Sequence, residues 1–93
     1  MTLNADQLTA LYDRHARELL AFLARRTSDP EAAVDILAET FAVAFEGRER
    51  FRGRGSGRAW LYAIARHRLA DYHRSASAKG RAIARRAPVS AAD

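Results

Sequence analysis

The sequence predicts an all-α fold, a compact bundle of three helices. Two long segments repeat apolar residues at helical spacing, and residues that favour helix N-termini precede each of them. A third amphipathic segment follows a loop rich in arginine and glycine. A chain of 93 residues suits one small domain, which we place at residues 5–74. Residues 75–93 are expected to form a basic tail, either a helical extension or a loose linker.

The first helix is predicted to run from about Ala5 to Arg26. Asn4 can cap it, with Gln7 three positions later, as in a capping box. His15 falls on the apolar face, and we interpret it as a packed or edge histidine because no second metal ligand is spaced near it. The other residues of this face are Leu8, Leu11, Tyr12, Leu19, Phe22 and Leu23.

The second helix is predicted from about Pro30 to Glu46, with Ser28 or Asp29 as its cap and Gly47 as its stop. A helical wheel separates three strips. The expected core strip contains Val34, Leu37, Phe41, Ala44 and Phe45. An acidic ridge contains Glu31, Asp35, Glu39 and Glu46. Ile36 and Val43 form a smaller apolar strip, which either packs on another helix or contacts a partner.

The segment from Gly47 to Arg58 alternates arginine with glycine. Glycine permits close backbone approach, and arginine donates to phosphate and stacks on bases. The alternative is a soluble connector without a binding role. The segment lacks the Gly-Lys-Ser/Thr sequence of a P-loop. Phe51 is its single apolar anchor, which we expect to tuck into the core.

The third helix is predicted from about Arg58 to Arg74. Its core arc contains Leu61, Ile64, Ala65, Leu69 and Tyr72, and its basic arc contains Arg66, His67, His73 and Arg74. Trp60 stands at the border, where it can pack in the core or stack on an unpaired base. Arg68 falls within the core arc, and we expect it to pair with a carboxylate of an earlier helix.

Charge divides the chain into two halves. Residues 1–46 carry four arginines against eight carboxylates, whereas residues 47–93 carry twelve basic residues against three carboxylates. This asymmetry favours two partners of opposite charge over a merely solvated surface. There is no cysteine, no apolar run long enough to span a membrane, and no carboxylate pair or Ser/His arrangement spaced for catalysis. We therefore expect no enzyme, metal, cofactor or membrane span, and a cytoplasmic location.

Three segments resemble, in order and spacing, region 2 of bacterial RNA polymerase sigma factors of the extracytoplasmic-function class. They read LYDRHARELLAFLARR, SDPEAAVDILAETFAVAF and RFRGRGSGRAWLYAIARHRLADYHR, and they cover about Leu8 to Arg74. The resemblance implies a non-enzymatic, nucleoid-associated transcription initiation domain. Its second helix would bind the clamp helices of the largest subunit of core RNA polymerase. Its loop and third helix would capture the single-stranded non-template strand of the −10 promoter element, with one base flipped into a pocket.

The residue pattern and the resemblance together predict two sets of contacts. The expected polymerase-binding residues are Asp35, Ile36, Glu39, Thr40, Val43 and Glu46. The expected DNA-binding residues are Arg50, Arg52, Arg54, Ser56, Arg58, Trp60, Tyr62, Ala63, Arg66, His67 and Arg74.

The sequence departs from the family pattern at three positions. Ala38 replaces a common glutamine, His67 replaces a common asparagine near the flipped base, and Gly57 replaces a bulky apolar residue of the loop. The second DNA-binding domain of such factors, region 4, is expected to be absent from these residues. Two other functions stay open: a helical module bound by an anti-sigma partner, and a general nucleic-acid-binding protein.

Overall fold

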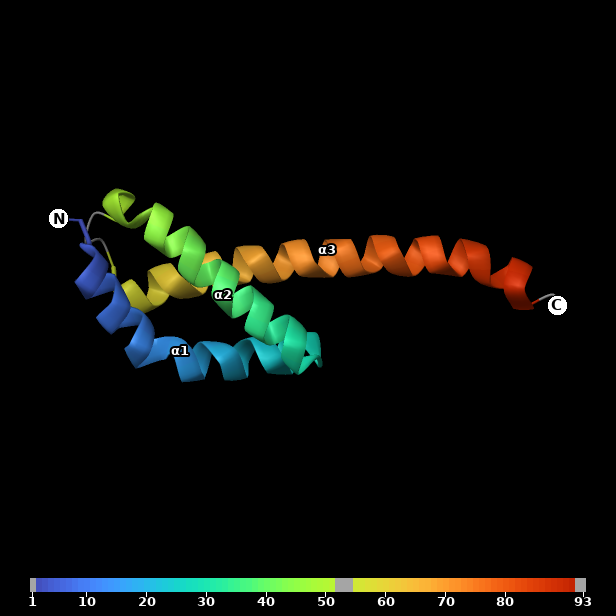
Figure 1. Cartoon of the computed structure of the whole chain (residues 1–93), viewed down its shortest axis with the longest axis horizontal. Helices are drawn as coiled ribbons and strands as arrows, with labels where there is room; N and C mark the ends of the chain where they lie inside the picture. Colours follow the sequence, from blue (N-terminus) through green and yellow to red (C-terminus); the bar gives the residue numbers. More distant parts are fainter. Residues whose placement is uncertain (1, 52–54, 92–93) are drawn as a thin grey trace.

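The computed structural model consists of three α-helices and one short 3-10 helix (Figure 1). It describes the backbone of residues 2–51 and 55–91, and the side chains of residues 2–51 and 55–77. The elements are α1 (Ala5–Thr27), α2 (Pro30–Glu46), the 3-10 helix η1 (Arg48–Arg50) and α3 (Gly57–Ala91). The predicted all-α, three-helix fold is therefore confirmed, and the predicted bounds of the first two helices are correct to within one residue.

Local side-chain bonds set where α1 and α2 begin. Asn4 and Gln7 form the predicted capping box, in which the Gln7 amide donates to Asn4 Oδ1 at 2.8 Å and the Asn4 amide donates to Gln7 Oε1 at 3.0 Å. Asp29 caps α2 by accepting from the amides of Glu31 and Ala32. Ser28, at φ 54°, occupies the left-handed region and ends α1 just before this cap.

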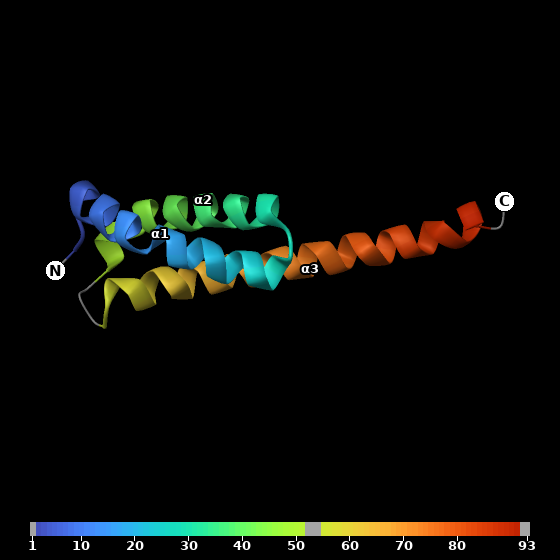
Figure 2. The ribbon, with the colours of Figure 1, turned by 90° about the horizontal axis from the view of Figure 1, so that it is seen from below.

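The core lies where the three helices meet. Leucines from α1 and α3 fill most of it, and buried alanines let the helices approach closely. Figure 2 shows the ribbons of α1, α2 and the first part of α3 lying against one another. The buried apolar residues are Leu8, Leu19, Phe22, Leu23, Ala33, Ile36, Ala44, Leu61, Ala65 and Leu69. Thr40 is also fully buried, and its hydroxyl donates to the Ile36 carbonyl at 2.8 Å, so no buried polar atom is left unsatisfied there.

The predicted core strip of α2 is partly wrong. Val34 is 54% exposed and Phe45 is 41% exposed, whereas Ile36 is only 3% exposed. The physical reason is that α2 contacts both other helices through the face that carries Ala33 and Ala44. These small residues allow a close approach of the helices. The larger Phe41 lies at the edge of this contact, with its ring centroid 4.5 Å from that of Tyr12.

Helix α3 continues well past the other two helices. Figure 1 shows a single helix that projects beyond the bundle, which gives the molecule extents of 61 × 22 × 19 Å. Of the two alternatives predicted for the tail, a helical extension and a loose linker, the structure shows the helical extension as far as Ala91. The prediction for Arg68 is wrong: it pairs with Asp71 of the same helix at 2.8 Å, because the spacing of three residues places the two side chains side by side.

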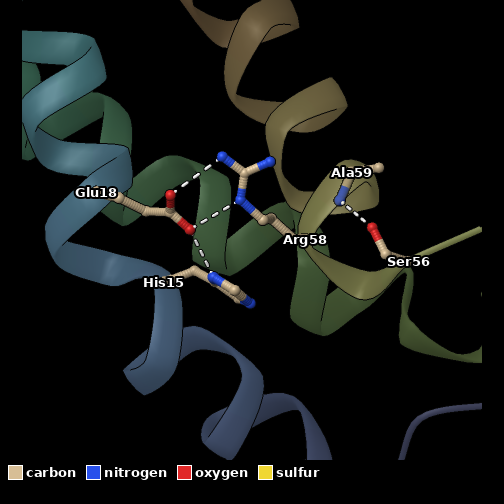
Figure 3. Close-up of polar contacts among 5 residues, drawn as sticks. All are labelled: His15, Glu18, Ser56, Arg58 and Ala59. Atoms are coloured by element: carbon tan, nitrogen blue, oxygen red, sulfur yellow. Dashed lines mark hydrogen bonds and ion pairs between the residues drawn. The ribbon is translucent and has the colours of Figure 1, made fainter.

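A carboxylate of α1 holds the start of α3 (Figure 3). Glu18 accepts two hydrogen bonds from Arg58, at 3.0 Å from Nε and 3.1 Å from Nη2, and His15 Nδ1 lies 2.6 Å from the same carboxylate. The pKa of Glu18 is lowered, first by the bond from Arg58 and then by the bond from His15. The Ser56 hydroxyl oxygen accepts from the Ala59 amide at 3.0 Å and caps the same helix start. These bonds fix the loop-to-helix junction against α1.

We expect acid to weaken this junction with a defined sign. A carboxyl group whose pKa is depressed by folding contributes stability above its unfolded value of 4.5, and this contribution disappears as the pH falls through the lower folded-state value. The Glu18→Gln variant should therefore be less stable than the unmodified chain at neutral pH, and the two should converge in acid. Urea unfolding at a series of pH values measures this difference. A stability gap that is independent of pH would contradict the prediction.

A second prediction tests which side of α2 is buried. Ala33→Leu places a larger side chain at a fully buried position, and overpacking of this kind costs about 1–3 kcal/mol. Ala38→Leu is the matched control, because Ala38 is exposed on the same helix and should change the stability by less than about 0.5 kcal/mol. Equal melting temperatures for the two variants would show that this assignment of the α2 face is wrong.

Candidate functional site

A groove runs between α2 and α3. One hollow of about 270 Å³ is lined by Val43, Trp60, Ala63, Ile64, His67 and Arg68. A neighbouring hollow of about 260 Å³ is lined by Val43, Glu46, Gly47, Arg50, Trp60 and Ile64. Because Val43, Trp60 and Ile64 line both hollows, we treat them as one feature, the α2–α3 groove. It has apolar walls, an aromatic ring and polar groups at its rim.

The loop before α3 holds Trp60 in this groove. The Phe51 and Trp60 ring centroids are 5.2 Å apart, and both side chains are half-buried. The Trp60 amide donates to the Ser56 carbonyl at 3.1 Å, so the indole is carried on the first turn of α3. Trp60 therefore packs on Phe51 while part of its ring stays open to the groove.

Gly57 accounts for the close contact between this first turn and α1. A Cβ atom at Gly57 would lie 2.7 Å from Cδ2 of Leu11, so any larger residue requires the Leu11 side chain to move. Where the family pattern has a bulky apolar residue, this chain has Gly57, and the first turn of α3 therefore packs directly on Leu11 of α1.

The acidic edge of α2 borders the same side of the molecule. Asp35 and Glu39 are exposed and line a further hollow of about 270 Å³ together with Arg68 and Asp71 of α3. Glu46 is exposed at the opposite end, beside Arg50. This edge presents carboxylates to any molecule that lies along α2.

Two of the residues predicted to bind polymerase are buried in this conformation. Ile36 is 3% exposed and Thr40 is 0% exposed, so both belong to the core. For Ile36, the structure selects the alternative that this residue packs on another helix, because the buried face of α2 lies farther from Phe45 than the wheel indicated. The other four lie at accessible positions, with Val43 in the α2–α3 groove beside Trp60.

The residues predicted to bind DNA divide into two sets. Arg50, Trp60, Ala63 and His67 lie in or beside the α2–α3 groove. Arg58, Tyr62 and Arg66 lie on the other flank of α3, which faces α1. Arg52 and Arg54 fall outside the described residues. Helix α3 therefore separates two surfaces that the sequence analysis treated as one.

Several of these residues already have partners. Arg58 is bonded to Glu18, Arg74 is bonded to Asp71, and the Ser56 hydroxyl caps α3. The spacing of Asp71 to Arg74 could have revealed the second pair from the sequence. Nothing in the sequence could have revealed the first, because Glu18 and Arg58 are 40 residues apart.

On the α1-facing flank, arginine side chains surround two aromatic rings. Phe22 and Tyr62 pack edge to face with centroids 5.2 Å apart. The Arg26 guanidinium carbon lies 4.0 Å from the Phe22 centroid, and that of Arg58 lies 4.6 Å from the Tyr62 centroid. Arg66 lies 5.8 Å from Phe22 and 5.9 Å from Tyr62. The sequence analysis did not identify Arg26, which lies near Arg66 only because α1 packs on α3.

The described residues lack two kinds of feature. They contain no group of three or more histidine or carboxylate side chains arranged to hold a metal ion. None of the helices in the described part of the chain is long and apolar enough to cross a membrane. The groove instead offers aromatic stacking, an imidazole edge and guanidinium groups.

Comparison with known proteins identifies the family. Residues 11–79 match the model of sigma-70 region 2. The chain is 41% identical over 69 residues to the RNA polymerase sigma factor YlaC of Bacillus subtilis, a match that covers 74% of this chain and 40% of that protein. It is 37% identical over 73 residues to the ECF RNA polymerase sigma factor SigL of Mycobacterium tuberculosis, covering 77% of this chain and 41% of that protein.

A third relative, the ECF RNA polymerase sigma factor BldN of Streptomyces coelicolor, is 34% identical over 73 residues, which is 76% of this chain and 27% of that protein. No solved structure matches the chain significantly. The chain thus spans less than half the length of these curated relatives. The family match covers most of this chain, including most of α1, all of α2 and α3 as far as residue 79. The chain therefore belongs to the sigma-70 region 2 family and is a region 2 domain of the extracytoplasmic-function class of sigma factors.

Proposed function

We propose that this domain docks on core RNA polymerase through the acidic edge of α2 and holds an opened strand of the −10 promoter element in the α2–α3 groove. The observation that carries the proposal is the groove itself, which places Trp60 and His67 of α3 opposite Val43 of α2. The family supports a role in transcription initiation, which requires binding and no catalysis.

The docking surface follows from charge and exposure. Asp35 and Glu39 are exposed one helical turn apart on α2, and a basic surface such as the clamp helices of the largest subunit would complement them. Ala38 is exposed near them and offers no hydrogen bond, so the contact depends on the two carboxylates. Ile36 and Thr40 support this surface from within the core instead of touching the partner.

The groove suits an unpaired base better than a stacked one. Val43 and Ile64 supply apolar walls, Trp60 supplies a stacking surface, and His67 supplies one donor and one acceptor in its neutral form. A base inside a duplex cannot reach these groups without leaving its neighbours. The domain would therefore bind the melted state more tightly than the duplex and shift the opening equilibrium toward it.

Exposed apolar side chains favour a second candidate function. Val34 and Phe45 are exposed on α2, on the side away from the α2–α3 groove, and Arg48 stacks over the Phe45 ring at 4.1 Å. A protein that covers this side of α2, such as an anti-sigma partner, would bury them. Such a partner would regulate the proposed function without replacing it.

Charge reversal at Glu39 tests the docking surface. We expect the full chain to co-migrate with bacterial core RNA polymerase in gel filtration and the Glu39→Lys variant to lose most of this binding, because two like charges would then face each other. Asp13→Lys is the control, since Asp13 is exposed on α1. If both reversals weaken binding equally, the contact depends on overall charge and the assignment to α2 is wrong.

Removal of the indole tests the capture of an unpaired base. The chain bound to core polymerase should prefer a fluorescently labelled single strand of mixed sequence to the corresponding duplex. Trp60→Leu should lower the single-strand affinity by about 5- to 150-fold, which corresponds to the 1–3 kcal/mol of one stacked base. Circular dichroism melting controls for the lost contact with Phe51. Equal affinities of the unmodified chain for single strand and duplex would overturn the proposed mechanism.

A further inference from the structure

The α1-facing flank of α3 carries a compact group of positive charges. We call Arg26, Arg58 and Arg66 the arginine cluster, since all three lie over the Phe22 or Tyr62 ring. Two helices contribute to it, and its aromatic base is part of the contact between them. Stacking on a ring restricts the motion of a guanidinium group before any ligand binds. The group therefore loses less conformational entropy when it binds an anion.

The cluster has more positive charge than its neighbours neutralise. Glu18 pairs with Arg58, but no carboxylate of the described residues lies within ion-pair distance of Arg26 or Arg66. Both guanidinium groups lie over the same Phe22 ring, so they are within about 10 Å of each other. The Debye length is about 8 Å at physiological ionic strength, so salt weakens the repulsion between these two exposed charges without removing it at shorter separations. An anion placed between them would relieve that repulsion.

The cluster also lies close to the α2–α3 groove, around the exposed side of α3. Arg66 is adjacent in sequence to His67, and Ala63 and Ala70 leave the exposed surface between the two flanks free of bulky side chains. A helix with its side chains is about 10 Å across, so a strand of a few nucleotides can reach from one flank to the other. The phosphates of a strand whose base occupies the groove would then come near Arg66 and Arg26.

We propose that the arginine cluster is a second DNA contact, in which Arg26 and Arg66 bind the phosphate backbone of the strand held in the α2–α3 groove. This inference rests on the proposed function for the identity of the strand. It assigns a DNA-binding residue to α1, the helix that otherwise serves as scaffold. Arg58 has a different role here: its guanidinium is held by Glu18, so it positions the start of α3 and contributes less charge to the strand.

The test compares two neighbouring arginines. Arg25 and Arg26 are both exposed on the last turn of α1, but only Arg26 lies over the Phe22 ring. The probe is a fluorescein-labelled 12-nucleotide single strand of mixed sequence, titrated with the full chain at several salt concentrations. Arg26→Gln should weaken binding several-fold and reduce the slope of log K against log salt by about 0.7, the value for one phosphate contact on a single strand. Arg25→Gln should leave both quantities unchanged, and Arg66→Gln should behave like Arg26→Gln.

Other outcomes are equally informative. Equal effects of Arg25→Gln and Arg26→Gln, no effect of Arg26→Gln, or no salt-dependent binding by the unmodified chain would each overturn the inference. Phosphate contacts require neither a promoter sequence nor polymerase, so a failure of polymerase docking does not affect this readout. Loss of affinity in Arg26→Gln but not in Trp60→Leu would support phosphate binding by the cluster but contradict its link to a base held in the groove. The reverse pattern would support the groove and reject the cluster.

Discussion

The close approach of three helices through buried alanines is the constraint on which the rest of the structure depends. Ala33 and Ala44 of α2 and Ala65 of α3 are fully buried, so the helix backbones come together and leucines fill the remaining space. This contact fixes the rotation of α2 about its own axis. Because Ile36 and Thr40 then face inward, Asp35 and Glu39 are left on the exposed edge. The same rotation brings Val43 opposite Trp60 and so creates the groove.

Helix α1 does more than complete the core. Glu18 on this helix holds Arg58, Leu11 packs directly on Gly57, and the Phe22 ring supports Arg26 and Arg66. The first two contacts fix where α3 begins, and hence where Trp60 sits. The third keeps two positive charges together with no carboxylate of the described residues within ion-pair distance. A single helix thus positions the aromatic side chain of the groove and provides one wall of the arginine cluster.

The proposed mechanism combines these features without any chemical step. In this mechanism, exposed carboxylates on α2 would bind a basic partner, while basic groups of α3 would attract nucleic acid to the α2–α3 groove; Arg68 lines both this groove and the hollow beside Asp35 and Glu39. Stacking in the groove would favour the binding of an unpaired base. Phosphate contacts beside the groove would strengthen binding whatever the base sequence. Under this proposal, opening of a promoter would be favoured because the domain would bind the opened strand more tightly than the closed duplex.

The sequence by itself determined the features that depend on neighbouring residues. Asn4 with Gln7 and Asp29 with Pro30 marked the starts of α1 and α2, because caps act within one turn, and helical spacing identified Leu61, Ala65 and Leu69 as core. The segments around Asp35 and Trp60 also led to the family. The tertiary structure alone decided which arc of α2 is buried, since a helical wheel orders residues around an axis but does not say which side a neighbour covers. It alone joined Glu18 to Arg58 and Arg26 to Arg66, because each pair lies some 40 residues apart and only the packing of α1 on α3 brings them together.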